Sequence, residues 1–188
     1  MSAYINVYAD SITDDLIPEI LKRLNEHEKK LTIEPVFSLR PSATTLSITF
    51  VWDKEGLSIF NGVTLNRTFK ISIKSFELKE FKQKILKDKI VNNSYSLRIR
   101  GMFGKKKKKF TKLLELSSAV EVQLQHCHKV FSIKYHHGDV FEKYHATLLG
   151  AVITEITGGI CHFTHKDIWY DSIEVMKASV ISIDSIYD

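Results

Sequence analysis

Histidine and cysteine are the residues of this chain most capable of chemistry, because they bind zinc and exchange protons near neutral pH. All but one of the histidines fall within residues 126–165 together with both cysteines, and the set is His126, Cys127, His128, His136, His137, His145, Cys161, His162 and His165. A structural zinc site needs four converging ligands, often as pairs at a fixed spacing. None of these clusters has a known paired spacing, so we expect no metal and no other cofactor. A zinc protein stays a third hypothesis, which metal analysis would test.

A second possible chemistry is acid–base catalysis by part of the same segment. His137, Asp139 and His145 could supply a base and an acid. Lys134 could stabilise a negative charge that develops during a reaction. The sequence contains no nucleophile motif, phosphate-binding loop, H-E-x-x-H zinc motif or dinucleotide fingerprint to accompany these residues. We therefore predict that the protein is not an enzyme.

A run of five lysines, Lys105–Lys109, is the main source of positive charge. It accounts by itself for the excess of 27 basic over 22 acidic side chains, so the rest of the chain is formally neutral. Such a run could follow a phosphate backbone, and the flanking Phe103 and Phe110 could stack on bases. More often such a run is a solvated loop that keeps a sheet edge from aggregating. Nucleic-acid binding or RNA processing through this segment is therefore the alternative hypothesis.

Targeting and membrane signals are not visible in the sequence. The N-terminus has no basic start followed by an apolar run, so we expect no signal peptide. The longest nearly apolar run, Leu148–Ile153, is interrupted by Gly150 and is far shorter than the ~20 residues of a membrane span. Two cysteines in 188 residues do not form a disulfide framework. These features favour a soluble cytoplasmic protein that binds no membrane.

The histidine-rich segment is predicted to contain a long helix followed by a short strand. Asp139 can accept a hydrogen bond from the first turn, and Gly158 suits the left-handed residue that ends a helix. Apolar side chains recur between them every three to four residues, at Phe141, Tyr144, Leu148 or Leu149, Val152 and Ile156. We expect a strand at Ile160–Phe163 and an aromatic loop at 168–170. Residues 172–183 begin with a helical pattern and end in a β-branched string, so their structure stays open.

Alternating apolar and polar residues predict strands in the rest of the chain. The pattern covers Tyr4–Ala9, Thr44–Trp52, Thr68–Phe76, residues 120–125 and residues 130–135. A hairpin of residues 120–128 and 130–136 would turn alternate histidines to opposite faces. Helices are predicted after Thr13 and Ser75. Because strands come in clusters rather than alternating with helices, we predict one α+β domain, 1–188, with a largely antiparallel sheet and about three helices packed on it.

The segment that follows the first histidines, residues 148–171, carries a family resemblance. It reads L-L-G-A-V-I-T-E-I-T-G-G-I-C-H-F-T-H-K-D-I-W-Y-D. It resembles a pattern in immunity proteins of bacterial polymorphic-toxin and contact-dependent growth inhibition systems, where a late helix ends in a T-[DG]-G turn before a short strand and an acidic-aromatic loop. The matching residues are Thr157-Gly158-Gly159, Ile160–Phe163, Asp167, Trp169 and Tyr170. The resemblance implies a protein that binds a cognate toxin domain and occludes its active site, without catalytic residues of its own.

A partner-binding surface can be predicted on this basis. Aromatic and arginine side chains usually dominate protein interfaces, and the residues expected to contact the partner are Arg100, Lys105, Lys107, His165, Asp167, Trp169 and Tyr170. Immunity proteins against basic nucleases tend to be acidic, because complementary charge steers association. The net charge of this chain is +5, so its toxin is expected to be acidic or held by apolar contacts. The toxin's identity and the oligomeric state stay open.

Overall fold

The computed structural model describes residues 2–13, 15–27, 31–32, 45–52, 65–87 and 116–187. The strands are β1 (Ser2–Ala9), β2 (Leu31–Thr32), β3 (Thr45–Trp52), β4 (Leu65–Ser75), β5 (Lys129–His136), β6 (Ile160–Phe163) and β7 (Ile168–Tyr170). The helices are α1 (Leu16–His27), α3 (Ser118–Gln125), α4 (Val140–Thr157) and α5 (Ser172–Tyr187), and residues 78–87 are also helical. Helices and strands are grouped along the chain, so the predicted α+β class is confirmed.

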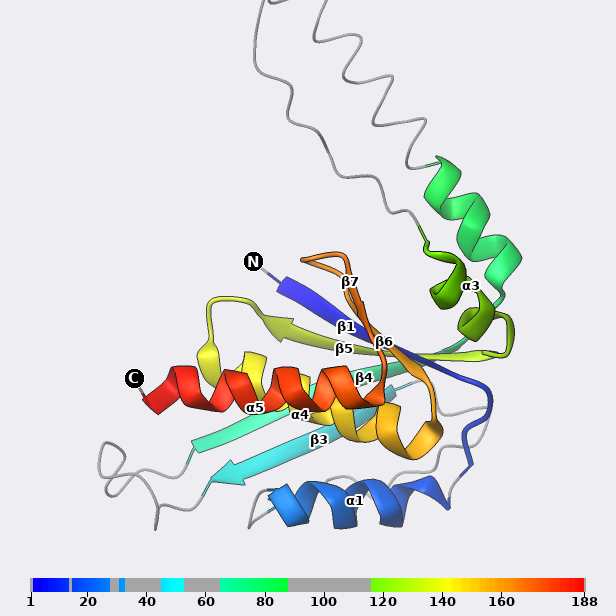
Figure 1. Cartoon of the computed structure of the whole chain (residues 1–188). Coiled ribbons are helices and arrows are strands. Elements are labelled where there is room, and N and C mark those ends of the chain that lie inside the picture. The colour runs from blue at the N-terminus through cyan, green and yellow to red at the C-terminus, as the bar shows by residue number, and fades with distance from the viewer. Residues whose placement is uncertain are drawn as a thin grey trace, which may run out of the picture.

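The described strands form one sheet in the order β2-β3-β4-β5-β1-β6-β7, and every neighbouring pair is antiparallel (Figure 1). β1 lies in the interior, where Ile5 is aligned with Ile133 of β5 and with Phe163 of β6. Successive side chains of a strand point to opposite faces. One face of β1 therefore carries Ile5 and the other carries Asn6.

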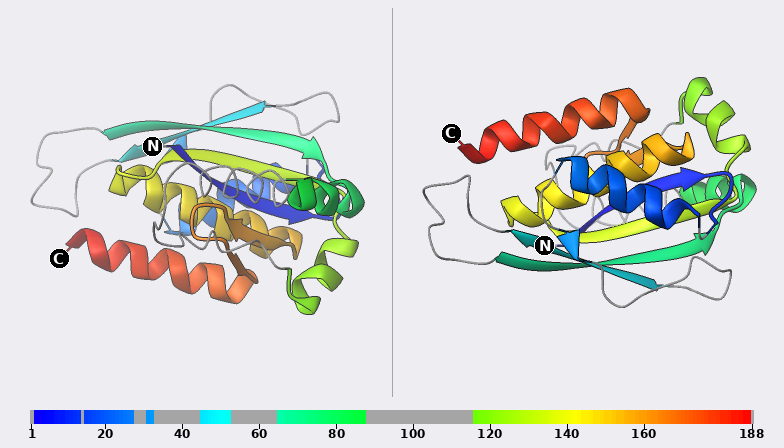
Figure 2. Two further views of the ribbon diagram at one scale, coloured as in Figure 1. Left: turned by 90° about the horizontal axis from the view of Figure 1, so that it is seen from above. Right: turned by 90° about the horizontal axis from the view of Figure 1, so that it is seen from below.

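Helix α4 is the centre of the layer that covers one face of the sheet. It contacts β1 and β5, and both α1 and α5 contact it (Figure 2). All side chains from Tyr144 to Thr154 are buried, so the helix is enclosed on every side rather than along the single stripe that its apolar spacing predicted. Gly150 permits the close approach to the sheet, because a Cβ there would lie 2.9 Å from Cγ2 of Ile5.

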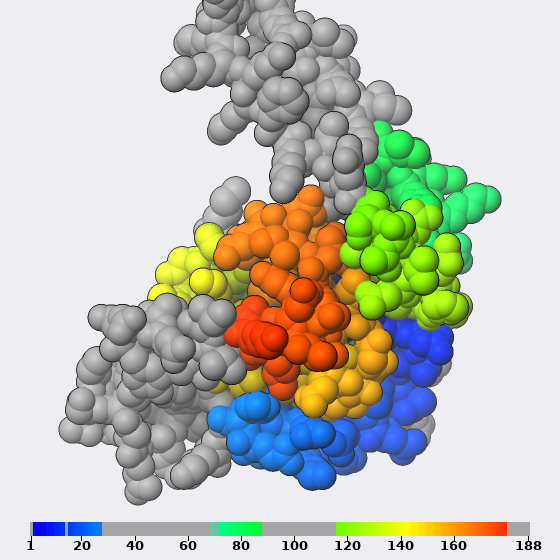
Figure 3. Space-filling model, in the orientation of Figure 1, coloured from blue at the N-terminus to red at the C-terminus, as the bar shows by residue number. Residues whose placement is uncertain are grey.

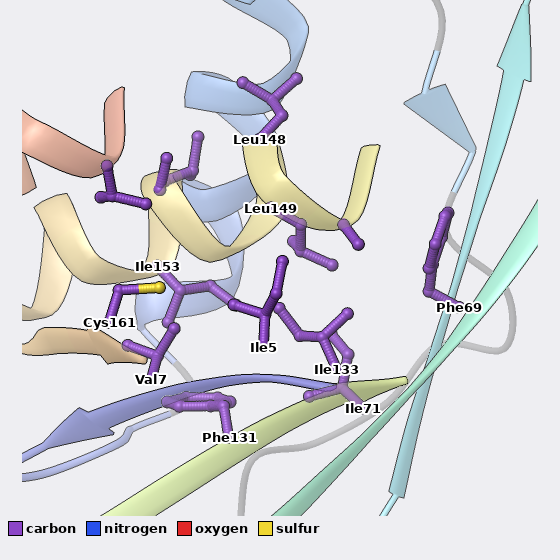
Figure 4. Close-up of a cluster of buried hydrophobic side chains, with 14 of the residues drawn as sticks. Ile5, Val7, Phe69, Ile71, Phe131, Ile133, Leu148, Leu149, Ile153 and Cys161 are labelled. Carbon is purple, nitrogen blue, oxygen red and sulfur yellow. The ribbon is translucent and has the colours of Figure 1, made fainter. Parts of the chain in front are cut away.

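The main core lies between this helix and the sheet. Figure 4 shows side chains of α4 meeting those of β1, β4 and β5, with Leu149 and Ile153 directed toward Ile5 and Val7. Cys161 of β6 belongs to the same core and is completely buried. Burying one of the Val, Leu, Ile or Phe side chains of this core contributes about 1.5–3 kcal/mol. The core thus joins an N-terminal strand to the C-terminal half of the chain.

A second, smaller core lies on the opposite face, near one end of the sheet. It comprises Tyr8, Phe76, Leu124, Cys127 and Ile160, with Leu78, Phe81, Leu116, Val120, Val130 and Trp169 packed against it. The rings of Tyr8 and Phe76 meet edge-on, with their centroids 4.7 Å apart. Helix α3 and the helical residues 78–87 therefore cover only this end of the second face.

Two predictions of local structure are corrected, and the structure of one segment that had been left open is now given. Residues 120–125 are helical, so the predicted hairpin of 120–128 with 130–136 does not form. The Ser117 side chain accepts a hydrogen bond from the N–H of Val120 and caps this helix. Residues 168–170 form strand β7 rather than an aromatic loop. Residues 172–187 are helical throughout, although the β-branched string had left them open.

Two predictions at the ends of α4 are confirmed. The Asp139 side chain accepts a hydrogen bond from the N–H of Glu142, and Gly158 ends the helix in the left-handed conformation, with φ of 60°. Among the described residues, no helix has both the length and the apolar character that a membrane crossing requires.

Candidate functional site

The loop between β6 and β7, residues 164–167, is fastened, that is, held by hydrogen bonds of its first and last residues. His162 Nε2 lies 3.1 Å from Oδ1 of Asp167, and the His162 ring stacks on Trp169 with centroids 4.1 Å apart and planes 7° from parallel. At the other end, Thr164 donates hydrogen bonds to the carbonyl of Tyr4 from both its N–H and its hydroxyl. The loop is therefore held in one conformation against the body of the sheet.

Asp167 has an unusual backbone. Its φ of 54° is the only positive value among the described residues other than glycine. Asp tolerates this region better than most residues, but the conformation still costs roughly 1 kcal/mol. The hydrogen bond to His162 and the following strand β7 offset that cost, because each fixes the direction in which Asp167 points.

His162 is buried, with 5% of its surface exposed, and its ring Nδ1 has no hydrogen-bond partner among the described residues. Burial lowers its pKa, and the hydrogen bond and charge of Asp167 act in the opposite direction. Asn6, which is aligned with His162 on β1, likewise has a buried side-chain oxygen that makes no hydrogen bond within the described part of the chain. The neutral His162 ring thus acts as the polar fastening of the loop.

A second cluster lies at the outer end of the loop, where His165 meets the turn after β5. The rings of His165 and His137 have centroids 4.6 Å apart. The hydroxyl of Tyr135 lies 3.1 Å from Nδ1 of His165. Burial lowers the pKa of His165, and the nearby positive groups His137, Lys166 and Lys143 lower it further. Burial also raises the pKa of Tyr135 to about 12, so its hydroxyl stays protonated at neutral pH.

The start of α4 borders this cluster. Glu142 accepts hydrogen bonds from the backbone N–H and the ring of His136, at 2.7 and 3.3 Å. An open depression of about 570 Å³ is lined by His136, Gly138, Asp139, Val140 and Phe141. The acidic side chains of this helical turn are thus engaged in holding the turn together.

The predicted partner-binding residues do not all lie together. His165 is exposed and Asp167 half-buried in the β6–β7 loop. Trp169 faces the second core beside Tyr8, whereas Tyr170 packs edge-on against Phe163 on the α4 side. The first two residues can face a common partner, while the two aromatic rings lie on opposite faces of β7. The remaining three, Arg100, Lys105 and Lys107, lie outside the described residues.

The four residues considered for acid–base catalysis do not all lie together. His145 is buried, and its Nδ1 lies 2.8 Å from the carbonyl oxygen of Phe141 in its own helix. Lys134 is exposed on the face of β5 opposite to Tyr135. The histidine that meets His137 is His165, which sequence spacing did not pair with it.

The cysteines and the remaining histidines are dispersed as well. Cys161 lies in the main core and Cys127 in the second core. His128 is hydrogen-bonded to Asp10 at 2.8 Å. Within the described part of the chain, no three His, Cys, Asp or Glu side chains are grouped so that they could hold a metal ion.

The fastening of the loop was missed at the sequence level. His162 and Asp167 are five residues apart, and only the tight turn between two paired strands brings them together. The signal that could have found them is the C-H-F-T-H-K-D-I-W-Y string itself, if residues 168–170 are taken as a strand.

Comparison with protein-family models, with curated proteins and with solved structures finds no match to this chain.

Proposed function

We propose that this protein is an immunity protein, which binds a cognate toxin domain and occludes its active site. The observation that supports the proposal best is the fastened β6–β7 loop. A loop that is ordered before binding loses less conformational freedom in a complex, so more of the contact energy becomes affinity.

The loop also offers suitable contact residues. His165 and Lys166 are exposed, and Ile168 of β7 retains 37% of its surface. β7 is the last strand of the described sheet, so its outer edge carries backbone groups that a partner strand or loop can bind. In Figure 3 this segment, in orange, forms part of the molecular surface between α5 and α3.

The chemistry of the loop favours recognition over catalysis. His162 and Asp167 form a histidine–carboxylate pair, but the histidine is buried and stacked on Trp169. Such a pair resembles the orienting half of a catalytic triad. No nucleophile accompanies it among the residues brought together here, so its contribution is to shape the loop.

Co-expression with the product of the gene immediately upstream tests the proposal. We expect the two proteins to purify together, and we expect the chain to relieve growth inhibition by that product. Ile168→Asp should weaken the complex about tenfold or more in calorimetry, as for a side chain near the centre of an interface. The matched control is Val122→Asp, because Val122 is 56% exposed on α3. Absence of a complex would refute the proposal. Equal affinity of the two variants for the partner would refute the placement of the contact surface at β7.

A further inference from the structure

The corner of the molecule where the β6–β7 loop meets the start of α4 gathers cationic groups from three separate segments. His137 comes from the turn after β5, Lys143 from the second turn of α4, and His165 with Lys166 from the loop. The surface of the α4 start, yellow in Figure 3, adjoins the orange surface of the loop. We propose that His137, Lys143, His165 and Lys166 form a binding site for a phosphate group.

The two histidine rings are placed to act on one ligand. Their centroids are 4.6 Å apart, with planes inclined by 48°, and both residues are exposed. When the Tyr135 hydroxyl donates to Nδ1 of His165, at 3.1 Å, the proton of the neutral ring resides on Nε2. That N–H is then available to a ligand. An oxyanion can accept hydrogen bonds from such rings and from lysine ammonium groups together.

The nearby acidic side chains are each hydrogen-bonded to a group outside the proposed site. Asp139 caps α4 through the N–H of Glu142, and Glu142 itself binds His136. Asp167 is held by His162. The other groups facing His165 are the hydroxyl of Tyr135 and the uncharged ring of Phe163. The groups that remain for a ligand here are ring N–H and ammonium donors, which suit an oxyanion and not a metal cation.

Binding should be coupled to protonation. Burial and, after it, the neighbouring positive groups disfavour a charged His165 in the free protein, and a bound phosphate would cancel the repulsion from those groups. By linkage, the phosphate must then bind the protonated form more tightly and raise the pKa of His165. Inorganic phosphate itself gains negative charge between pH 6 and pH 8, so its affinity alone does not report the protonation of the ring. The raised pKa of His165 in the presence of phosphate is therefore the expected result.

Proton NMR of the histidine ring Cε1–H resonances, with inorganic phosphate as the probe, tests the proposal. We expect saturable shifts of the His137 and His165 resonances and an upward displacement of the His165 titration curve. His128 is the internal control, because it is exposed and bonded to Asp10. Sodium chloride at equal ionic strength should produce neither effect. Glycerol phosphate in a parallel titration distinguishes a phosphomonoester ligand from free phosphate; shifts with either one support the site.

Variants separate the site from general surface charge. Lys166→Gln should weaken phosphate binding severalfold, Lys166→Arg should restore it, and His128→Gln should leave it unchanged. Tyr135→Phe should alter the pH dependence more than the limiting shift, because it removes the group that sets the His165 tautomer. Two outcomes would overturn the proposal. One is an equal phosphate-induced shift of the His128 and His165 resonances. The other is a His137 shift that persists in the double variant Lys166→Gln, His165→Gln. The site stands independently of the toxin complex, since free protein is used throughout.

Discussion

Replacement of Gly159 by alanine tests the junction between α4 and β6. A Cβ on Gly159 would lie 2.2 Å from the carbonyl oxygen of Tyr8. Contacts under 3.0 Å are essentially never seen, so the two backbones must separate by roughly 0.8 Å. Tyr8 is paired there with Ile160 of β6. Overpacking costs about 1–3 kcal/mol, and a weakened strand hydrogen bond costs about 1 kcal/mol. We therefore expect Gly159→Ala to lower the free energy of unfolding by about 3 kcal/mol.

Two other glycines provide matched controls for this substitution. Gly158 has φ of 60° but no atom within 4 Å of its would-be Cβ, so Gly158→Ala should cost about 1–2 kcal/mol through backbone strain alone. Gly138 does not have a left-handed backbone, and no atom of the described residues lies within 4 Å of its would-be Cβ. Gly138→Ala should therefore change stability by less than about 0.5 kcal/mol.

Urea unfolding, followed by circular dichroism and tryptophan fluorescence, gives the three free energies of unfolding. Fluorescence is suited to this site because Trp169 packs on Tyr8, with ring centroids 5.4 Å apart. We expect the loss in free energy of unfolding to increase in the order Gly138→Ala, Gly158→Ala, Gly159→Ala. If Gly159→Ala were as stable as Gly138→Ala, the close contact between the α4–β6 junction and β1 would not exist.

Three further predictions follow from buried groups and from the lysine run. Burial lowers the pKa of His162 in the folded state. Below the ordinary histidine pKa of about 6.5 the unfolded chain therefore binds more protons than the folded one, and the free energy of unfolding should fall as the pH drops from about 7 to about 5. His162→Gln should flatten this decline in urea unfolding. Burial raises the pKa of Cys127 to about 11 and that of Cys161 to about 12. Both thiols should therefore resist iodoacetamide at neutral pH until urea unfolds the protein. Rapid labelling of the folded protein would contradict their placement. If the Lys105–Lys109 segment binds nucleic acid, affinity should fall steeply with salt and disappear when all five lysines become alanine; binding that is absent or insensitive to salt excludes that alternative.

Features set by neighbouring residues were predictable from sequence. Asp139 and Gly158 mark the ends of α4 because capping depends on one side chain or one backbone angle. The alternation in β1 was equally informative, since its two faces meet different cores. Residues 120–125 misled because six residues fit either periodicity. Their helix is decided by the Ser117 cap and by the burial of Leu124 against the second core.

The candidate sites depended on contacts that sequence spacing does not encode. His137 and His165 are 28 positions apart in the sequence and meet only because β5 and β6 both flank β1. His162 and His165 are three residues apart but belong to different environments, one buried and one exposed. They differ because His162 lies in the buried strand β6, whereas His165 lies in the loop that follows it. The left-handed backbone of Asp167 has no signature that a single aspartate would reveal.

The interior position of β1 also has a consequence for synthesis on the ribosome. Its partner β5 begins about 120 residues later in the chain, and β6 later still. At roughly 5–20 residues per second, β1 waits roughly 6–24 s after translation before a neighbour can pair with it. During that interval the apolar side chains of Ile5 and Val7 are exposed to other nascent chains. Efficient production of this protein should therefore depend on chaperones that shield the early strand, more than its native stability would suggest.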